Sequence, residues 1–406
     1  MISGWFLSIF RLFHVHRLGN RDLLMPNQPL LSIVIPTRNR AETAIYAIKS
    51  ALSVSMSDNV EVIVHDCSDG NELETQIPSI KDPRLKYFKV APCDMTANWN
   101  LAFGYVKGKY VTYIGDDDCV LKIIMRVAEQ CDLLGIDSVW STRPATYFWP
   151  KWDGKTLNGY LIVYPYTNKE EPFSIKNSTE ELLLRKHSLS GEFPNAYQGL
   201  VKVSLLRKIQ QIAGVCFLTH CPDAFLSVLL CMYSKNCWKV DYPFVLNGVS
   251  QASNSGRSTI KGKASMEHYN EYKDAQPDFI PTGLLLMEGI RAEIIFECLK
   301  LLNMEWFFFK NYPLIKMYAA ALVARKQNIR NRIDVIRKYF HFVSGSSIKF
   351  PYFLLACLSM FVMNIQRKVS IKKKNSMARH YDNIAHISQA AGFLQDSVDS
   401  TEVRLI

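Results

Sequence analysis

The sequence predicts an α/β fold in which a mostly parallel sheet is flanked by helices and followed by a helical C-terminal region. Short β-branched runs alternate with helix-like stretches between residues 30 and 125, and such alternation is typical of a parallel sheet. Polar clusters follow three of these runs, at the strand ends where ligands gather in such sheets. From Pro281 to Arg337 the pattern is helical and rich in Leu, Met and Phe.

The first predicted strand is Leu31 to Ile35, which is β-branched and is followed by Pro36. A helix is predicted from Ala41, because its apolar residues Ile45, Ile48 and Leu52 are spaced to share one helix face. The next apolar run, Val60 to Val64, predicts a second strand.

Further along, Arg84 to Val90 predicts a third strand, Met95 to Tyr105 a helix, and Tyr110 to Ile114 a fourth strand. Ser138 to Pro172 predicts irregular loops or short strands. Ser178 to Lys186 and Val203 to Ile212 are predicted to be helical, and residues beyond Lys374 to form a polar, poorly ordered tail. The expected organisation is an apolar N-terminal segment 1–29, two halves of one α/β domain at 30–125 and 126–280, a helical region 281–374, and the tail 375–406.

Composition indicates a folded protein that contacts an anionic surface. The chain has 406 residues, 48% hydrophobic residues and a net charge of +11. Basic residues crowd one C-terminal stretch that contains Arg367, Lys368, Lys372, Lys373, Lys374 and Arg379. Because this cluster adjoins an apolar run, it favours a membrane surface over nucleic acid. The ten cysteines lack zinc-type spacing, which indicates reduced thiols.

Two uncharged segments are candidates for membrane contact. Met1 to Phe10 is too short to span, since ten helical residues cover about half of a ~30 Å hydrocarbon core. Phe350 to Gln366 is 17 residues long, at the short end of the range for a spanning helix. We expect it to lie on the membrane surface in preference to spanning, with an ordinary buried helix as the alternative.

Three consecutive carboxylates, Asp116 to Asp118, directly follow the fourth predicted strand. Adjacent negative charges at the end of a buried strand need a compensating cation or hydrogen-bond donors. A solvated turn that caps a helix is the alternative. The upstream clusters Thr37 to Arg40 and His65 to Asp69 are expected at the same sheet edge, and together the three describe a nucleotide-diphosphate site.

These motifs resemble the nucleotide-sugar glycosyltransferases of family 2, which have a GT-A fold. The resemblance rests on Ser32 to Arg40, Glu61 to Asp66, and Asn100 through Gly108, Lys109 and Tyr110 to Asp118. It covers roughly residues 30 to 125 in the order and spacing of the family. It implies an inverting sugar transfer that uses a divalent metal, Mn²⁺ or Mg²⁺.

By resemblance, Asp117 binds the metal, Asp118 supports that ligand from behind or is an alternative ligand, and Asp116 lies nearer the ribose. The donor is then held by residues of the three polar clusters and of the predicted helix Met95 to Tyr105, with Asp66 as an acceptor from a uracil-like base or, alternatively, a turn acid. This set comprises Pro36, Thr37, Arg38, Asn39, Arg40, Asp66, Asp69, Trp99, Asn100 and Asp116.

The sequence departs from the family pattern at two positions. Gly115 stands where many members carry the first acid of an Asp-x-Asp motif, and Trp99 stands where many carry an Arg. If that Arg meets phosphate, Arg38, Arg40 or a later basic residue must supply the charge instead. Alternatively, Trp99 packs beneath the nucleotide loop.

An inverting transfer needs a general base that takes a proton from the acceptor hydroxyl. By resemblance this base is Asp223, since Pro222 and Asp223 open an apolar helix; a helix-capping Asp without a catalytic part is the alternative. The stretch Asn247 to Arg257 is expected to be a flexible polar loop, with Arg257 as a clamp on the diphosphate or as part of an exposed linker.

The resulting hypothesis is a glycosyltransferase that moves a sugar from a nucleotide-diphosphate sugar, preferably a UDP-sugar, to a lipid-linked or polysaccharide acceptor in cell-surface glycan synthesis. Its expected location is the cytoplasmic side of the membrane, peripheral or weakly anchored, without nucleic-acid binding. Two alternatives remain: a non-catalytic nucleotide-sugar-binding or scaffold protein of the same fold, and a nucleotidyltransferase.

Overall fold

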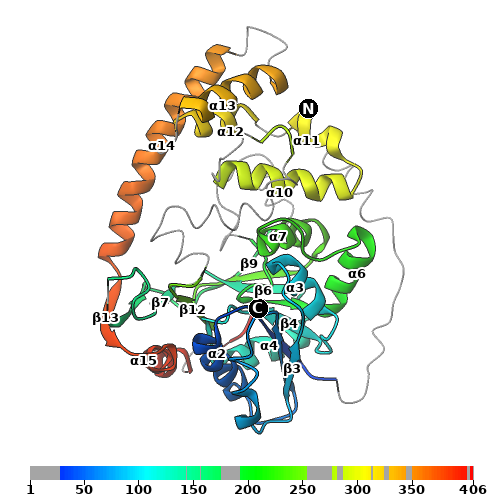
Figure 1. The fold of residues 1–406 in the computed structure, drawn as a ribbon, viewed down its shortest axis with the longest axis vertical. Coiled ribbons are helices and arrows are strands. Elements are labelled where there is room, and N and C mark those ends of the chain that lie inside the picture. Colours follow the sequence, from blue (N-terminus) through cyan, green and yellow to red (C-terminus); the bar gives the residue numbers. More distant parts are fainter. Residues whose placement is uncertain are drawn as a thin grey trace.

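The computed structural model describes residues 28–142, 144–155, 157–174, 193–253, 277–280, 287–311, 314–323, 329–343, 350–399 and 403–405. It shows two sheets with helices on both faces and a group of helices stacked above one of these faces (Figure 1). The predicted α/β class with a helical C-terminal region is confirmed. The predicted helix at Ser178 to Lys186 lies outside the described residues.

The larger sheet has the strand order β3-β2-β1-β4-β10-β6-β11-β9. Its first four strands are parallel and its second half is mixed. The strands are β1 (Leu31–Thr37), β2 (Val60–Asp66), β3 (Leu85–Lys89), β4 (Tyr110–Tyr113), β6 (Ser138–Ser141), β9 (Glu170–Pro172), β10 (Gly199–Lys202) and β11 (Cys237–Val240).

A smaller sheet lies beside the acidic end of β4 and has the order β13-β8-β7-β12-β5. Its strands are β5 (Cys119–Val120), β7 (Ala145–Phe148), β8 (Gly159–Val163), β12 (Val245–Val249) and β13 (Arg379–Ile384). The short strands predicted between Ser138 and Pro172 are therefore present and belong to both sheets.

Alternating side chains of the parallel strands build two apolar cores. Ile33 and Ile35 of β1 point to one core, whereas Val34 between them points to the other, as expected from the two-residue period of a strand. One face is covered by α2 (Ala41–Ser53) and α4 (Ile123–Leu134), and the other by α3 (Met95–Phe103), α6 (Val203–Ala213) and α7 (Pro222–Tyr233) (Figure 1). A short 3-10 helix, η1 (Ile77–Ser79), lies between β2 and β3.

The core that contains Val34 continues from the sheet, past α3, α6 and α7, into the C-terminal helices. These are α10 (Met287–Leu301), α11 (Glu305–Asn311), α12 (Leu314–Val323), α13 (Ile329–Phe342) and α14 (Phe350–Ser376). Helix α14 extends the predicted apolar segment by ten residues into the lysine-rich stretch. Within the described ranges, no helix has the length and apolar character needed to cross a membrane.

The prediction of a poorly ordered tail beyond Lys374 is wrong. Strand β13 pairs antiparallel with β8, and helix α15 (Ile387–Asp399) packs against α2 and β5. The reason is that Ile387, Ala390, Leu394 and Val398 are spaced along one helix face and are buried. The chain thus returns from the helical region to the α/β domain (Figure 1).

Candidate active site

The acidic turn, defined as residues 114–118, connects β4 to β5. Its three carboxylates are almost inaccessible to solvent: Asp116 is 1% exposed, Asp117 3% and Asp118 0%. Buried carboxylates require partners, and each of the three has a different set. The solvated-turn alternative is therefore excluded by burial.

Asp116 connects the acidic turn to the loop after β1. Its two oxygens accept hydrogen bonds from Thr37 Oγ1 at 2.7 Å and from Arg40 Nη1 at 2.7 Å. Burial raises the pKa of Asp116 to about 6, an effect that Arg40 opposes and the Asp117 charge increases. Burial lowers the pKa of Arg40, but Asp116 and Asp117 outweigh it and the pKa is raised, so Arg40 is a permanent cation here.

Asp118 connects the acidic turn to β12. One oxygen accepts from Gly248 N at 2.8 Å, and the other accepts from Gln198 Nε2 and Gly115 N, both at 2.7 Å. Burial and the neighbouring Asp117 raise the pKa of Asp118 to about 7, while these three donors lower it. Both oxygens of Asp118 are therefore held by donors of the protein, and its role at a metal stays a prediction.

Asp117 is held more loosely at its carboxylate than its neighbours. Its Oδ2 accepts from Ser250 N at 2.9 Å, and its main-chain oxygen accepts from Trp149 Nε1 at 2.9 Å. A Cβ atom added to Gly248 would lie 1.7 Å from that main-chain oxygen. Strand β12 can therefore approach the acidic turn only with glycine at position 248.

Gly115, which stands where many family members carry the first acid of an Asp-x-Asp motif, is closely surrounded by side chains. A Cβ atom added to Gly115 would lie 3.0 Å from Asp117 Oδ1 and 3.0 Å from the Tyr197 hydroxyl. A carboxylate at this position would crowd both groups. The Tyr197 ring lies next to Trp99, with the ring centroids 5.7 Å apart.

The donor set suits a divalent cation that binds together with a phosphorylated ligand. In the part of the chain that the structure describes, no group of three or more His, Cys, Asp or Glu side chains is arranged to hold a metal. However, Mg²⁺ is commonly bound by one or two carboxylates plus substrate phosphates and water. Asp117 could supply such a carboxylate, and the nearby oxygens of Gln198 (Oε1) and Ser250 (Oγ) are buried with no hydrogen-bond partner among the described residues.

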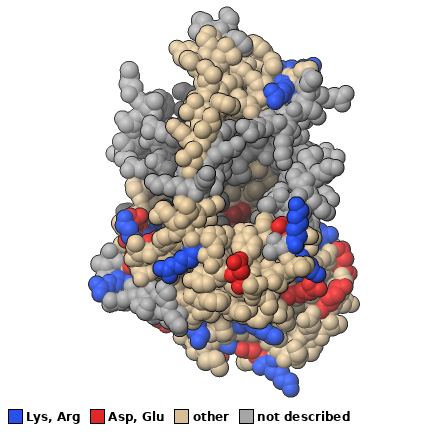
Figure 2. All heavy atoms as spheres, turned by 90° about the vertical axis from the view of Figure 1, so that its left-hand side faces the viewer, with Lys and Arg blue, Asp and Glu red and all other residues tan. Residues whose placement is uncertain are grey.

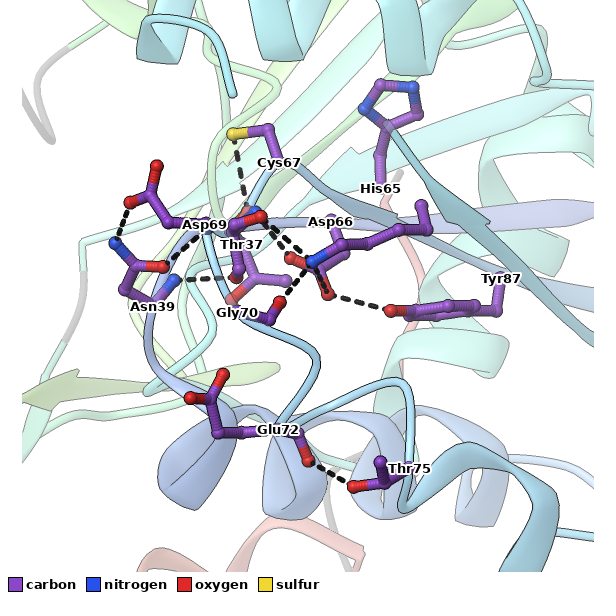
Figure 3. Close-up of polar contacts among 12 residues, drawn as sticks. Thr37, Asn39, His65, Asp66, Cys67, Asp69, Gly70, Glu72, Thr75 and Tyr87 are labelled. Atoms are coloured by element: carbon purple, nitrogen blue, oxygen red, sulfur yellow. Dashed lines mark hydrogen bonds and ion pairs between the residues drawn. The ribbon is translucent and has the colours of Figure 1, made fainter. Parts of the chain in front are cut away.

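The loops after β1 and β2 are joined side by side, as Figure 3 shows. Asn39 has a left-handed backbone (φ 57°), which Asn tolerates better than most residues. Its main-chain N donates to Ser68 Oγ at 2.7 Å, and its side chain forms reciprocal hydrogen bonds with Asp69 at 2.5 and 2.9 Å. Two predicted donor-binding residues, Asn39 and Asp69, thus fix each other.

Asp66 lies under these loops and is fully buried. Its carboxylate accepts from Ser68 N at 2.8 Å and from the Tyr87 hydroxyl at 2.7 Å, with Lys89 Nζ 3.6 Å away (Figure 3). These contacts are those of the turn acid that the sequence left as an alternative.

Of the other residues predicted in the first loop, Pro36 is paired within the sheet and Arg38 is exposed. Pro36 lies opposite His65 in the β1–β2 register. Arg38 donates to the Cys93 main-chain oxygen at 3.3 Å and lies 3.8 Å from the Asp69 carboxylate. The Arg38 charge is therefore at the surface of the joined loops.

Trp99 and Asn100 are placed differently from the donor-binding prediction. Trp99 is buried in the core, stacked on Tyr113 at 4.9 Å and edge-on to Phe217 at 5.2 Å. Asn100 donates to the Phe217 main-chain oxygen at 2.8 Å and accepts from Phe217 N at 3.3 Å. Both residues contact Phe217 in the segment before α7, Trp99 through its ring and Asn100 through hydrogen bonds. Trp99 therefore packs in the core, and its predicted part in donor binding stays a prediction.

Asp223 lies in the first helical turn of α7 and is partly exposed. The segment before it is anchored by buried His220, whose Nδ1 is 3.2 Å from Glu293 Oε1 of α10. Arg257 lies outside the described residues.

The sequence did not reveal four residues that organise the acidic turn: Tyr197, Gln198, Gly248 and Ser250. The predicted flexible loop from Asn247 is wrong at its start, since Asn247 to Val249 belong to β12. Gln198 has a left-handed backbone (φ 58°) that propensity does not predict. Gly248 was the one available signal, because an isolated glycine inside a strand often marks close backbone approach.

Part of the sequence is similar to proteins of a known family. Residues 32–180 match the family model described as glycosyl transferase family 2. The putative colanic acid biosynthesis glycosyl transferase WcaA of Escherichia coli is 40% identical over 96 residues, which are 23% of this chain and 34% of that protein. A GalNAc(5)-diNAcBac-PP-undecaprenol β-1,3-glucosyltransferase of Campylobacter jejuni is 32% identical over 100 residues, 23% of this chain and 31% of that protein.

The chain thus spans about a third of the length of these curated relatives. The crystal structure of S. aureus TarS 1–349 with UDP-GlcNAc aligns over 77% of this chain and 90% of that one, with 14% identity and a TM-score of 0.44, a likeness too weak to carry an argument. The family model and the sheet topology confirm the predicted family and its GT-A-like α/β class. Residues 32–180 of the chain therefore carry the sequence pattern of glycosyltransferase family 2.

Proposed function

We propose that this protein transfers a sugar from a nucleotide-diphosphate sugar, preferably a UDP-sugar, to a lipid-linked or polysaccharide acceptor, with inversion at the anomeric carbon. The observation that carries the proposal is the arrangement of the acidic turn. Asp116 joins this turn to the loop after β1. The segment at the end of β12 holds Asp117, one of whose carboxylate oxygens lies near Gly115. Two relatives are named as β-1,3-glucosyltransferases that act on diphosphoundecaprenol-linked acceptors. A lipid-linked acceptor favours work at the cytoplasmic face of a membrane.

In the mechanism, Asp117 would hold Mn²⁺ or Mg²⁺ together with the donor diphosphate. When bound, the cation stabilises the negative charge that develops on the departing diphosphate. Thr37 and Arg40 fix Asp116, while Gly248 and Gln198 fix Asp118, so that the turn does not need to reorganise during the reaction.

On the acceptor side, Asp223 takes the proton from the acceptor hydroxyl as its oxygen attacks the anomeric carbon. The new carbon–oxygen bond forms as the bond to the diphosphate oxygen breaks on the opposite face, which inverts the configuration. The position of Asp223 supports this role, because it lies in the first turn of α7 and is partly exposed, as contact with an acceptor requires.

The test compares two isosteric variants, Asp117→Asn and Asp223→Asn, by titration with UDP, GDP and dTDP in the presence and absence of Mn²⁺. We expect Asp117→Asn to abolish metal-dependent nucleotide binding, and Asp223→Asn to bind normally but to lose transfer from a panel of UDP-sugars by about 100-fold or more. The matched control is Asp132→Asn, which should behave as wild type. Asp132 lies on α4 and forms a partly exposed ion pair with Lys109.

Three outcomes would count against the proposal. Metal-independent binding of all three nucleotides would remove the metal role of Asp117. Full transfer by Asp223→Asn would move the base to another residue. Nucleotide-sugar binding without turnover on any acceptor would favour the non-catalytic alternative.

A further inference from the structure

Helix α14 has two apolar faces, and only one of them packs against the rest of the chain as far as the structure describes it. Phe353 and Met360 on the first face are 2% and 5% exposed, and they pack into the core shared with α12 and α13. The Phe353 ring stacks on Tyr339 of α13 with centroids 4.1 Å apart. This face fixes α14 to the helical region.

The second face is an apolar stripe in contact with solvent. At 100° per residue its six members fall within an arc of about 120°, opposite Phe353 and Met360. Each side chain is 49–65% exposed, and together they form the apolar stripe: Leu354, Leu355, Leu358, Phe361, Val362 and Ile365. Figure 2 views the molecule from the side on which α14 lies in Figure 1, and the described atoms in its upper half are mostly tan. The sequence from Phe350 to Gln366 contains no charged residue.

The charge of α14 indicates what covers the stripe. The helix contains no Asp or Glu, whereas five basic residues, Arg367, Lys368, Lys372, Lys373 and Lys374, follow the stripe within its last ten positions. Such a stretch attracts anionic lipid headgroups, with each basic residue contributing to the attraction. A second copy of the chain would add another cationic segment instead of a complementary one.

The packed face of α14 limits how deeply the helix can enter a membrane. Because Phe353 and Met360 are already packed against the protein, α14 cannot be surrounded by lipid without losing these contacts. An amphipathic helix with one free apolar face and a basic flank lies in the plane of the membrane interface. This agrees with the finding that no described helix is suited to cross a membrane.

We infer that the apolar stripe docks α14 flat onto a membrane surface that carries anionic headgroups, with the basic end of the helix in the headgroup layer. This surface is separate from the nucleotide site, and docking does not depend on sugar transfer. It orients the α/β domain, to which α14 is joined through β13 (Figure 1).

The test is sedimentation of the full chain with vesicles of phosphatidylcholine alone or mixed equally with phosphatidylglycerol, at low and high salt. We expect wild-type protein to bind the anionic vesicles, and the double variant Leu358→Glu/Ile365→Glu to bind at least about tenfold more weakly. The matched control is Leu133→Glu/Leu157→Glu, which adds the same charge at leucines 75% and 72% exposed outside the helical region, and it should bind as wild type.

UDP binding by each variant checks that the α/β domain is folded, and Leu355→Glu alone replaces the double variant if that protein does not fold. The inference is overturned if wild-type protein stays in the supernatant with both vesicles, or if the stripe variant binds as tightly as the control. It is also overturned if the stripe variant converts a dimer to a monomer in light scattering while vesicle binding is unchanged, because the occupant would then be a second copy.

Discussion

The sheet edge that carries the acidic turn and the C-terminal helical region are held together in different ways. At the sheet edge, polar contacts join segments far apart in the chain, such as Thr37 with Asp116 and Ser250 with Asp117. The helical region is held by aromatic and aliphatic packing around residues such as Phe279, Tyr318 and Tyr339. Directional hydrogen bonds fix individual atoms, whereas apolar packing fixes only which surfaces meet.

This difference is consistent with two different tasks. A site that stabilises developing charge needs donors and carboxylates in preset positions. A surface that contacts lipid needs only apolar area of the right shape, so α14 can leave one face without a protein partner. The buried His220–Glu293 contact is one of the polar links between the two regions, and Tyr164 with Asn375 of α14 is another.

The largest expected effect is that of Gly248→Ala. The added Cβ would lie 1.7 Å from the main-chain oxygen of Asp117 and 2.5 Å from its carbon, and backbone atoms cannot yield cheaply. We expect transfer to fall about 100-fold or more and the free energy of unfolding to fall by about 3 kcal/mol. Sugar-transfer assays and urea unfolding measure the two effects.

Gly392→Ala is the matched control, since a Cβ atom there meets nothing within 4 Å in helix α15. It should leave transfer unchanged and stabilise the protein by roughly 0.5–1 kcal/mol. Equal behaviour of the two variants would show that the acidic turn is not fixed by its contact with β12.

A smaller, pH-dependent effect is expected for Glu293→Gln, which cuts the buried polar link to His220. Burial lowers the pKa of His220, but its contacts with Cys221 and Glu293 outweigh this and raise the pKa to about 10. Because the folded pKa lies above the usual 6.5, this stabilisation is complete below about pH 6.5 and is lost as the pH rises through about 10. Glu293→Gln should therefore lower the free energy of unfolding by roughly 1.5–3 kcal/mol at pH 6 and by little at pH 10.5.

Urea unfolding at pH 6, 8 and 10.5 gives the difference between wild type and this variant at each pH. A loss that is the same at all three values would mean that His220 is neutral in the folded protein. The contact would then be ordinary packing between the segment before α7 and helix α10.

The smallest effect is expected at the joined loops, where Asn39→Ala and Asn39→Gly can be compared. Both remove the side-chain contacts with Asp69, but only alanine also bears the left-handed backbone cost of about 1 kcal/mol. Nucleotide affinity should fall severalfold more for alanine than for glycine, as measured by UDP titration. Equal affinities would show that the backbone geometry of this loop does not position the donor.

Local sequence patterns predicted most of the strands between residues 30 and 125. The runs at Leu31, Val60 and Tyr110 became parallel strands, and the polar clusters after them meet at one sheet edge. These predictions succeeded because strand propensity and the geometry of parallel sheets depend on nearby residues. The ordered tail was missed because α15 is stabilised by α2 and β5, which lie far away in sequence.

By itself, then, the sequence determined the α/β class, the family resemblance and the location of the acid cluster. Only the tertiary structure decided the separate partners of the three acids, which include Arg40, Gln198, Gly248 and Ser250. It also decided which face of α14 is free, because the sequence shows apolar residues on both faces and burial distinguishes them. The physical reason is that a residue type sets what a side chain can do, whereas its partners and solvent exposure arise from contacts between distant segments.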